Sequence, residues 1–282
     1  MFISNKNRRR HRFIDQVIES GYNTLTNPEV VQRLGASAVD LLDIHSRLFV
    51  PKVTAGDEVR IPLQQRQQGG IPIIALSPKE SVYISNDLYE LTPRQRASAI
   101  GVLQSKFPNA DPDKALDLTI KELQGRHGSQ SSGRLKRSVS QNEAAIVYTM
   151  STKGDPQLTC WPMIVLNYDQ KDNITMPDYG PIFVHEATHV VQLERDSVLP
   201  RLDAALETRR DQRGELEAMA AGAQALAGLR ASGLECTDPV WQCTIDDIRK
   251  EANAGSIDPM AATPDVIRGL RAAGIVHKLL TM

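Results

Sequence analysis

The stretch from Pro181 to Glu194, PIFVHEATHVVQLE, holds the residues whose types and spacing could do chemistry. His185 and His189 are four residues apart, so on a helix both imidazoles project from the same side, about one turn apart. Two imidazoles so placed can bind one divalent metal ion, and Zn²⁺ is the usual choice for nitrogen ligands in a tetrahedral site. Glu186 lies close enough to take a proton from a water on that ion. The spacing therefore predicts a metal site with an adjacent general base.

A helix must carry this triplet. The residues around it are mostly apolar, which suits burial of one helix face. Gly180 and Pro181 precede it, and proline suits the first helical position, so we expect the helix to begin at Pro181. The alternative is a buried helix whose two histidines only form hydrogen bonds within the core.

The pattern His-Glu-x-x-His resembles the motif of the zinc metallopeptidases called zincins. In zincins a sheet precedes this helix, and its edge strand binds an extended substrate. Here EAAIVYTMS (143 to 151) and WPMIVLNY (161 to 168) are typical of strands and come just before the helix. The resemblance covers roughly residues 143 to 229. It implies an α+β fold with a small, mainly antiparallel sheet packed on the HExxH helix.

A third protein ligand should follow, because catalytic zinc typically takes three and leaves a position for water. The helical stretch 209 to 230 contains Glu215 and Glu217. Residues at helical spacing after Glu215 are all small or apolar, whereas Gln224 interrupts the face of Glu217, so periodicity favours burial of Glu215. The segment ELEA also resembles the ExxA form of the glutamate helix in gluzincins, which implies that Glu215 is the ligand. There are two alternatives to this assignment: Glu217 is the ligand, or Glu215 is only a solvated charge on the helix.

Two supporting roles are less well defined by the sequence. Several gluzincin families place Asp or Asn four residues after the glutamate ligand, where this chain has Met219. Another acid, Asp178 or Asp196, would then have to orient a histidine. A second donor usually holds the oxyanion, and His277 is a weak candidate because it is the only histidine after the HExxH helix.

The reaction that the resemblance implies is zinc-dependent hydrolysis of a peptide bond in a protein or peptide substrate, by a housekeeping, mobile-element or toxin-like protease. Glu186 would accept the proton of the attacking water. One alternative is a catalytically silent metal-binding or regulatory protein on the same scaffold. A structural site needs no base, so Glu186 argues against it.

Charge is unevenly distributed along the chain. The net charge is −1, but residues 1 to 142 carry +6 and residues 143 to 282 carry −7, counted from the sequence. The basic excess lies mainly at 6 to 12 and 126 to 137, where no aromatic residues are interleaved. A nucleic-acid-associated protein is therefore a second alternative, but solvated segments explain these clusters better.

The 282 residues suit a globular protein of one or two domains. No run is long and apolar enough for a membrane helix. The basic N-terminus has no apolar run behind it, so we expect a protein that is cytoplasmic when made, with export by a signal-independent route as an option.

We expect an N-terminal helical and β region of unknown role at 1 to 124, a Gly/Ser/basic linker or loop at 125 to 142, and the zincin-like domain at 143 to 282. In the first region, helices are expected at 11 to 22, from Asn27-Pro28, and through 36 to 49, and short strands between 48 and 85. Further helices are expected at 92 to 107, 111 to 124, 238 to 254 and 263 to 280.

Three cysteines, Cys160, Cys236 and Cys243, are too few for a disulfide scaffold. The turn-forming segment CTDPVWQC could bring Cys236 and Cys243 together, but two reduced cysteines are the simpler interpretation.

Overall fold

A computed structural model describes residues 5–53, 58–60, 69–84, 135–137, 144–149, 162–196 and 204–236, with residues 139 and 141 and isolated residues between 97 and 114. The helices expected at 92 to 107, 111 to 124, 238 to 254 and 263 to 280 fall on or mostly on residues outside these ranges. The same is true of His277, Cys160 and Cys243.

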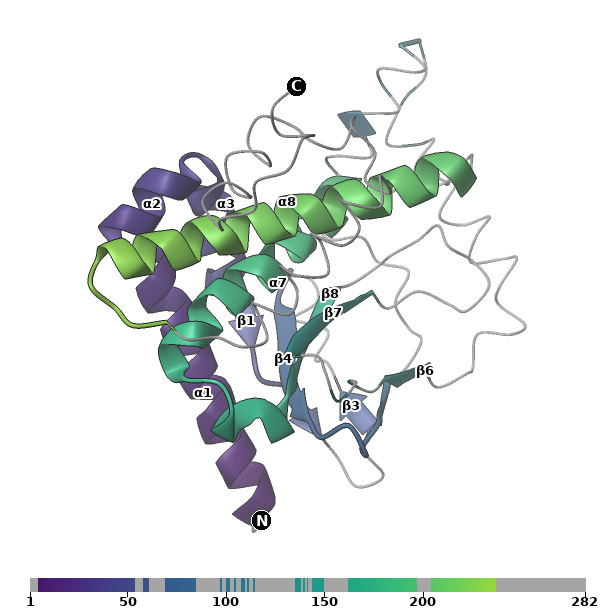
Figure 1. Ribbon diagram of the computed structural model, residues 1–282. Coiled ribbons are helices and arrows are strands. Elements are labelled where there is room, and N and C mark those ends of the chain that lie inside the picture. The colour runs from purple at the N-terminus through teal and green to yellow at the C-terminus, as the bar shows by residue number, and fades with distance from the viewer. Residues whose placement is uncertain are drawn as a thin grey trace.

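Helices dominate the described part of the chain (Figure 1). The N-terminal helices confirm the expected order, although the first spans Asn5–Leu25 and is longer than the expected range of 11 to 22. Asn27 caps α2 as expected, since its side-chain oxygen accepts hydrogen bonds from the backbone N–H groups of Glu29 and Val30 at 3.0 and 3.3 Å. The helices are α1 (Asn5–Leu25), α2 (Pro28–Leu34), α3 (Ser37–Ser46), the 3-10 helix η1 (Tyr168–Asp172), α7 (Met176–Asp196) and α8 (Ala204–Ala231).

The strands form two four-stranded sheets. The first has the order β1 (Leu48–Phe49), β4 (Ile71–Leu76), β8 (Pro162–Asn167) and β7 (Ala145–Thr149). The second has the order β2 (Lys52–Val53), β3 (Glu58–Arg60), β5 (Val82–Ile84) and β6 (Leu135–Arg137). The chain is thus helix-rich with small sheets, which agrees with an α+β fold.

The expectation of a mainly antiparallel sheet is wrong, because both sheets are mixed. In the first, β4 pairs in parallel with β1 and with β8, and only β7 and β8 are antiparallel. Every residue of β4 and β8 is buried. Their runs IPIIAL and PMIVLN lack the alternation of a half-exposed strand, and continuous apolar runs are typical of parallel strands covered on both faces.

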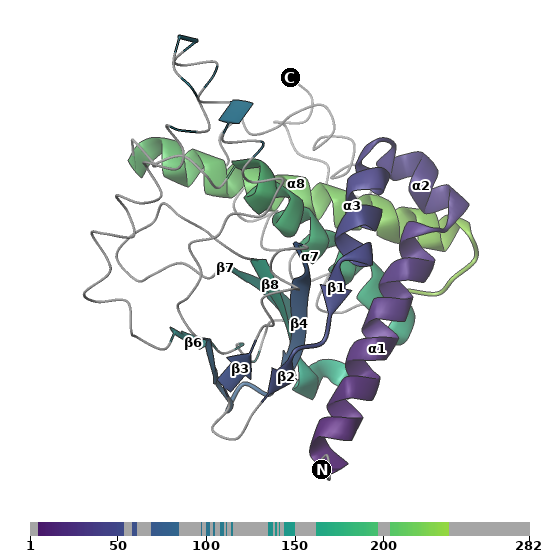
Figure 2. The same cartoon turned by 180° about the vertical axis from the view of Figure 1, so that it is seen from behind.

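The pairing of β4 with β8 joins the N-terminal region to the part that was expected to form the catalytic domain. α1 likewise packs on α7 and on β4, and Figure 2 shows it alongside the β1 end of the first sheet. Most of the segment 125 to 142 lies outside the described ranges, so the division of the chain at that segment stays a prediction.

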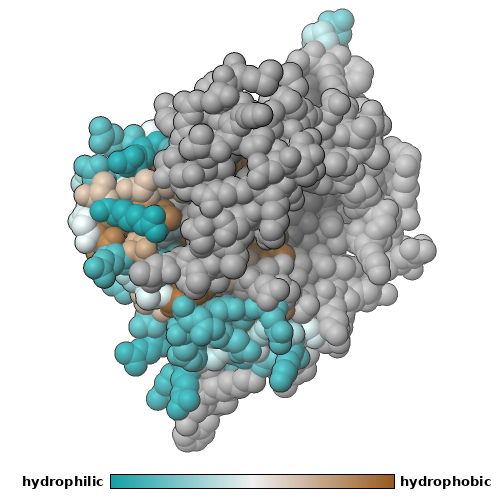
Figure 3. Space-filling view, in the orientation of Figure 1, coloured by the Kyte–Doolittle hydropathy of each residue, from teal (hydrophilic) through white to brown (hydrophobic). Residues whose placement is uncertain are grey.

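α7 lies between the sheet and α8. It contacts β7 and β8, α1 and α3, and it packs along α8, which in turn contacts α2. On the face seen in Figure 3, hydrophilic residues cover most of the described surface, with apolar residues showing near α2 and the end of α8. Within the described ranges, no helix is both long enough and apolar enough to cross a membrane.

The helix expected to begin at Pro181 begins a turn earlier, at Met176, so Pro181 lies inside it. The true start carries its own signals, which are Pro177 in the first turn and Asp178, whose side chain accepts a hydrogen bond from the Thr175 hydroxyl. Gly180 lies inside the helix for a packing reason, because a Cβ there would lie 1.9 Å from the Thr24 hydroxyl oxygen in α1.

A second glycine lets α8 approach α2. A Cβ on Gly228 would lie 2.8 Å from the Cα and backbone N of Val30, and backbone atoms cannot move aside as a flexible side chain can. We therefore expect Gly228→Ala to destabilise the protein by about 1–3 kcal/mol through overpacking, despite the better helix propensity of alanine.

Chemical denaturation measures this effect, and Gly101→Ala is the control. Gly101 has helical backbone, and an added Cβ meets no atom within 4 Å. That substitution should be neutral or stabilising by up to about 1 kcal/mol. Equal stability of the Gly228→Ala variant and wild type would contradict the close approach of the two helices.

Candidate metal centre

α7 presents both histidines to α8. The Nε2 atoms of His185 and His189 lie 3.1 Å apart, and the two rings meet edge to face with centroids 4.7 Å apart. Both side chains are largely buried, with 12% and 23% of their surface exposed. The four-residue spacing thus has the expected result, since both imidazoles point to one place.

α8 adds a carboxylate to the same place. Oε1 of Glu215 lies 3.5 Å from Nε2 of His185, and Oε2 lies 3.2 Å from Nε2 of His189. One potential ligand atom from each of the three residues lies within 4.8 Å of the others. Among the described residues, these three form the cluster of His, Cys, Asp or Glu side chains that could hold a metal ion. Two neighbouring helices therefore bring together the three residues expected from the sequence.

The distances fit a tetrahedral ion. Ligand atoms held about 2.0–2.1 Å from zinc at tetrahedral angles are about 3.3 Å apart. The two histidine Nε2 atoms lie 3.1 Å apart, and each lies close to a different Glu215 oxygen, at 3.5 Å for His185 and 3.2 Å for His189, so these separations are near that value. Two imidazoles and a carboxylate are also a donor set that zinc accepts with one position left over. The residues present thus fit the ion that the motif implies.

Glu186 is buried, with 6% of its surface exposed. Its negative charge helps to raise the pKa of His189, so the carboxylate lies near this candidate ligand. A buried glutamate retained beside two histidines is the arrangement that the pattern predicts for a base.

Two of the three candidate ligands, His189 and Glu215, carry opposite charges at neutral pH when no ion is bound, and His185 is neutral. Burial and the neighbouring His189 lower the pKa of His185 to about 4. Burial also opposes a charge on His189, but the hydrogen bond to Glu215 and the charges of Glu186 and Glu215 outweigh it and raise the pKa of His189 to about 9. Burial acts to raise the pKa of Glu215, but His189 and His185 lower it to about 2. His189 and Glu215 therefore form an ion pair at neutral pH.

This ion pair makes the stability of the metal-free protein depend on pH. The pKa of His189 is raised from 6.5 to about 9, so its contribution is complete below pH 6.5 and is lost as the pH rises to about 9. The pKa of Glu215 is lowered from 4.5 to about 2, so its contribution is complete above pH 4.5 and is lost as the pH falls.

We therefore expect the stability advantage of wild type over His189→Gln to shrink between pH 6.5 and pH 9. Urea unfolding of both proteins in the presence of a chelator measures it. A difference that stays constant over this range would contradict the ion pair.

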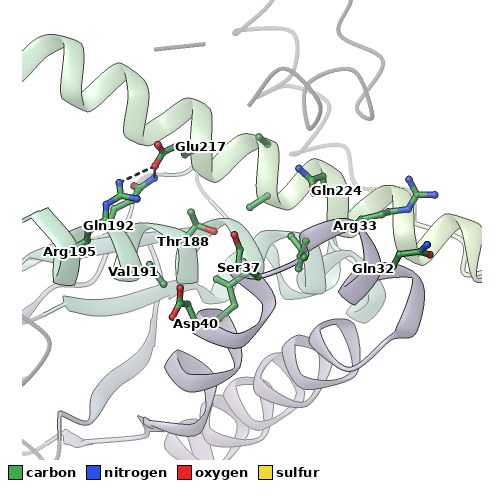
Figure 4. A pocket seen from close by; sticks show the side chains of 16 residues that line it. Gln32, Arg33, Ser37, Asp40, Thr188, Val191, Gln192, Arg195, Glu217 and Gln224 are labelled. Carbon is green, nitrogen blue, oxygen red and sulfur yellow. Dashed lines mark hydrogen bonds and ion pairs between the residues drawn. The ribbon is translucent and has the colours of Figure 1, made fainter. Parts of the chain in front are cut away.

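Glu217, the alternative ligand, points elsewhere. One of its carboxylate oxygens accepts hydrogen bonds from the side chains of Gln192 at 3.2 Å and Arg195 at 3.1 Å (Figure 4). The burial argument that favoured Glu215 is wrong in one respect, because the side chain of Glu215 is 50% exposed and that of Glu217 only 18%. The apolar face itself is correct, since Ala218 and Met219 are fully buried. Glu215 therefore lies at the exposed edge of that face.

Neither Asp178 nor Asp196, the acids expected to orient a histidine, has a described contact with His185 or His189. Asp178 lies in the first turn of α7 and pairs with Thr175, while Asp196 is the last residue of that helix and its side chain lies outside the description. Sequence reasoning missed Gln192, whose side-chain oxygen lies 2.9 Å from Nδ1 of His189. Its spacing was a usable signal, because it lies three residues after His189 on the same helix face.

A cavity of about 560 Å³ lies beside the site, between the α2–α3 connection, α7 and α8 (Figure 4). Thr188, Gln192 and Glu217 line it, but the candidate ligands and Glu186 do not. On the α7 helix, Thr188 and Glu186 project to opposite sides of the two histidines. The cavity therefore lies on the Thr188 side of the two histidines, opposite the side of Glu186.

The described residues thus define a class of site, a three-donor group of two imidazoles and one carboxylate that could hold a metal ion. Comparison of the chain with models of known protein families, with curated proteins and with solved structures found no match. The likeness to zincins accordingly rests on these residues and on their arrangement in space.

Proposed function

We propose that this protein is a zinc-dependent metallopeptidase of the gluzincin kind, with His185, His189 and Glu215 as metal ligands. The observation that carries the proposal is the convergence of these three side chains with donor separations of 3.1 to 3.5 Å. Three protein ligands leave a fourth position open, which is characteristic of catalytic sites, whereas structural zinc sites usually have four.

In this proposal Glu186 is the general base. A zinc ion bound here would make a water acidic enough to lose a proton near neutral pH and would polarise the scissile carbonyl. The Glu186 carboxylate accepts the proton of the attacking water and then gives it to the leaving amine. Burial of Glu186 keeps bulk water away from the carboxylate, which strengthens its interactions with nearby charges.

The edge of the first sheet offers a place for the substrate. β7 pairs with β8 on one side, and within the described ranges no strand pairs with its other side. α7 contacts β7, so this edge lies next to the helix that carries the histidines. An extended peptide could add to β7 through main-chain hydrogen bonds, as peptides do at exposed sheet edges.

The ligand set is tested by a matched pair of substitutions on α8. We expect Glu215→Ala to lower zinc affinity by more than about 100-fold, because losing a ligand costs more than losing a residue that supports one. Glu217→Ala, two residues along the same helix, should cost about tenfold or less, because the contacts described for Glu217 are with Gln192 and Arg195.

Competition with a chromogenic chelator measures both affinities, together with the metal content of the purified protein and casein digestion with and without chelator. Zinc binding that is insensitive to Glu215→Ala would refute the ligand set. Zinc bound by the wild type without digestion of casein would favour a regulatory or binding protein on the same scaffold.

A nucleic-acid role remains the other candidate from charge alone. It predicts affinity for DNA or RNA that falls steeply with added salt. Absence of binding at low salt would exclude it.

A further inference from the structure

Gln192 connects one histidine to the neighbouring helix. It is buried, with 8% of its surface exposed. Its side-chain oxygen lies 2.9 Å from Nδ1 of His189, and its side-chain nitrogen donates to the backbone oxygen of Gly214 at 2.7 Å and to Glu217 at 3.2 Å. The amide nitrogen has two hydrogens and two acceptors, so the oxygen is the atom that faces the imidazole.

This orientation decides which imidazole nitrogen keeps its proton. An amide oxygen can only accept, so Nδ1 of His189 must donate to it. Nε2 is then the nitrogen that gives up its proton, and it is the atom that faces His185 and Glu215. A metal-binding imidazole needs this form, with one nitrogen bare toward the ion and the other held by a hydrogen bond.

From these contacts we propose that Gln192 is the positioning residue of the metal centre, which fixes the tautomer and ring orientation of His189 and is itself held by α8. The inference deepens the proposed function and rests on it. The role of orienting a histidine, which the sequence led us to expect of Asp178 or Asp196, thus belongs to the side-chain amide of Gln192 in α7.

The anchoring on α8 depends on close packing at Gly214. A Cβ on that residue would lie 3.2 Å from the same Gln192 oxygen that faces His189. The absence of a side chain there leaves room for the amide to lie against the helix backbone. Arg195 holds Glu217 at 3.1 Å, so the acceptor on the far side of the amide is also fixed.

Two substitutions separate positioning from packing. Gln192→Glu keeps an acceptor for the Nδ1 proton but brings a second carboxylate beside Glu217. Gln192→Leu removes the acceptor but places an apolar side chain of similar size in a buried position. Positioning predicts that zinc affinity falls about 10–100-fold in Gln192→Leu and stays within about threefold of wild type in Gln192→Glu.

Unfolding of the metal-free proteins should give the opposite order, with Gln192→Glu the less stable because of the like charges. Gln224→Leu is the matched control, because Gln224 is also 8% exposed and lines the same cavity from α8, but has no contact with His189 among those described. It should leave zinc affinity unchanged. If Gln192→Glu does not fold, the double variant Gln192→Glu/Glu217→Gln removes the repulsion and should restore zinc affinity.

Zinc affinities in which Gln192→Leu equals or exceeds Gln192→Glu would overturn the inference, because a residue that only packs would give that order. Zinc binding by wild type and Gln224→Leu with an undiminished affinity in Gln192→Leu would overturn the inference alone. No zinc binding by the wild type would overturn the proposed function as well.

Discussion

Replacing Glu186 by glutamine is expected to reduce peptide hydrolysis by about 10²–10⁴-fold, the usual contribution of a general base, while zinc stays bound. Glutamine has nearly the same size as glutamate but cannot accept a proton at neutral pH. The candidate metal ligands are other residues, so the ion should remain. Activity and metal content therefore separate in this variant, which they do not in a variant that loses a ligand.

Casein digestion and metal analysis of the same preparations measure the two effects. Because Glu186 is buried, unfolding of the variant must be followed alongside, and glutamine should be tolerated since it removes a buried charge. Digestion by Glu186→Gln at the wild-type rate would exclude the residue as the base.

Replacing Arg47 by alanine is expected to destabilise the protein by about 3–5 kcal/mol, which is the range for breaking a buried ion pair by removing one partner. The guanidinium donates to both carboxylate oxygens of Glu194 at 2.7 and 2.8 Å, and also to the backbone oxygen of Gly69 at 3.1 Å. Glu194 is 2% exposed and would be left as a buried charge. Burial acts to lower the pKa of Arg47, but Glu194 and Asp43 raise it above its ordinary value.

The double variant Arg47→Met/Glu194→Leu is the control for this prediction. It removes both charges and keeps similar volumes, so it should recover most of the lost stability. Urea denaturation of wild type, single variant and double variant gives the comparison. A loss below about 1 kcal/mol in Arg47→Ala would mean that the pair behaves like an exposed one. Glu194 lies five residues after His189, so this contact also fixes the end of the helix that carries the ligands.

The sequence predicts the part of the site that depends on local spacing. His185, Glu186 and His189 occupy one helix, and helical geometry alone decides where their side chains point. The strands at 145–149 and 162–167 and the cap at Asn27 were predictable for the same reason, since each signal lies within a few residues. Periodicity and the resemblance both favoured Glu215 as the ligand, but its distance from the histidines depends on how two helices pack, which local spacing does not determine.

What could not be predicted depends on contacts between distant segments. The parallel partner of β8 is β4, which lies far upstream in the chain, so the motif and the two strands before it could not reveal a mixed sheet. The position of α7 depends on Gly180 against Thr24, and the support of His189 depends on Gly214 against Gln192. In each case the glycine has no local sequence signal, and the need for it comes from a side chain that only the tertiary fold brings close.

One turn of α8 has a wider consequence. This turn contains Glu215. The backbone oxygen of Gly214 accepts a hydrogen bond from the Gln192 side chain that contacts His189, and a hydrogen bond with the Ala218 backbone acts to raise the pKa of His185. An ion bound there would clasp the two long helices together across the segment between them, so that melting of either one would release it. Zinc at 100 times its dissociation constant would then raise the free energy of unfolding by about 2.7 kcal/mol, and chelation would lower the melting temperature.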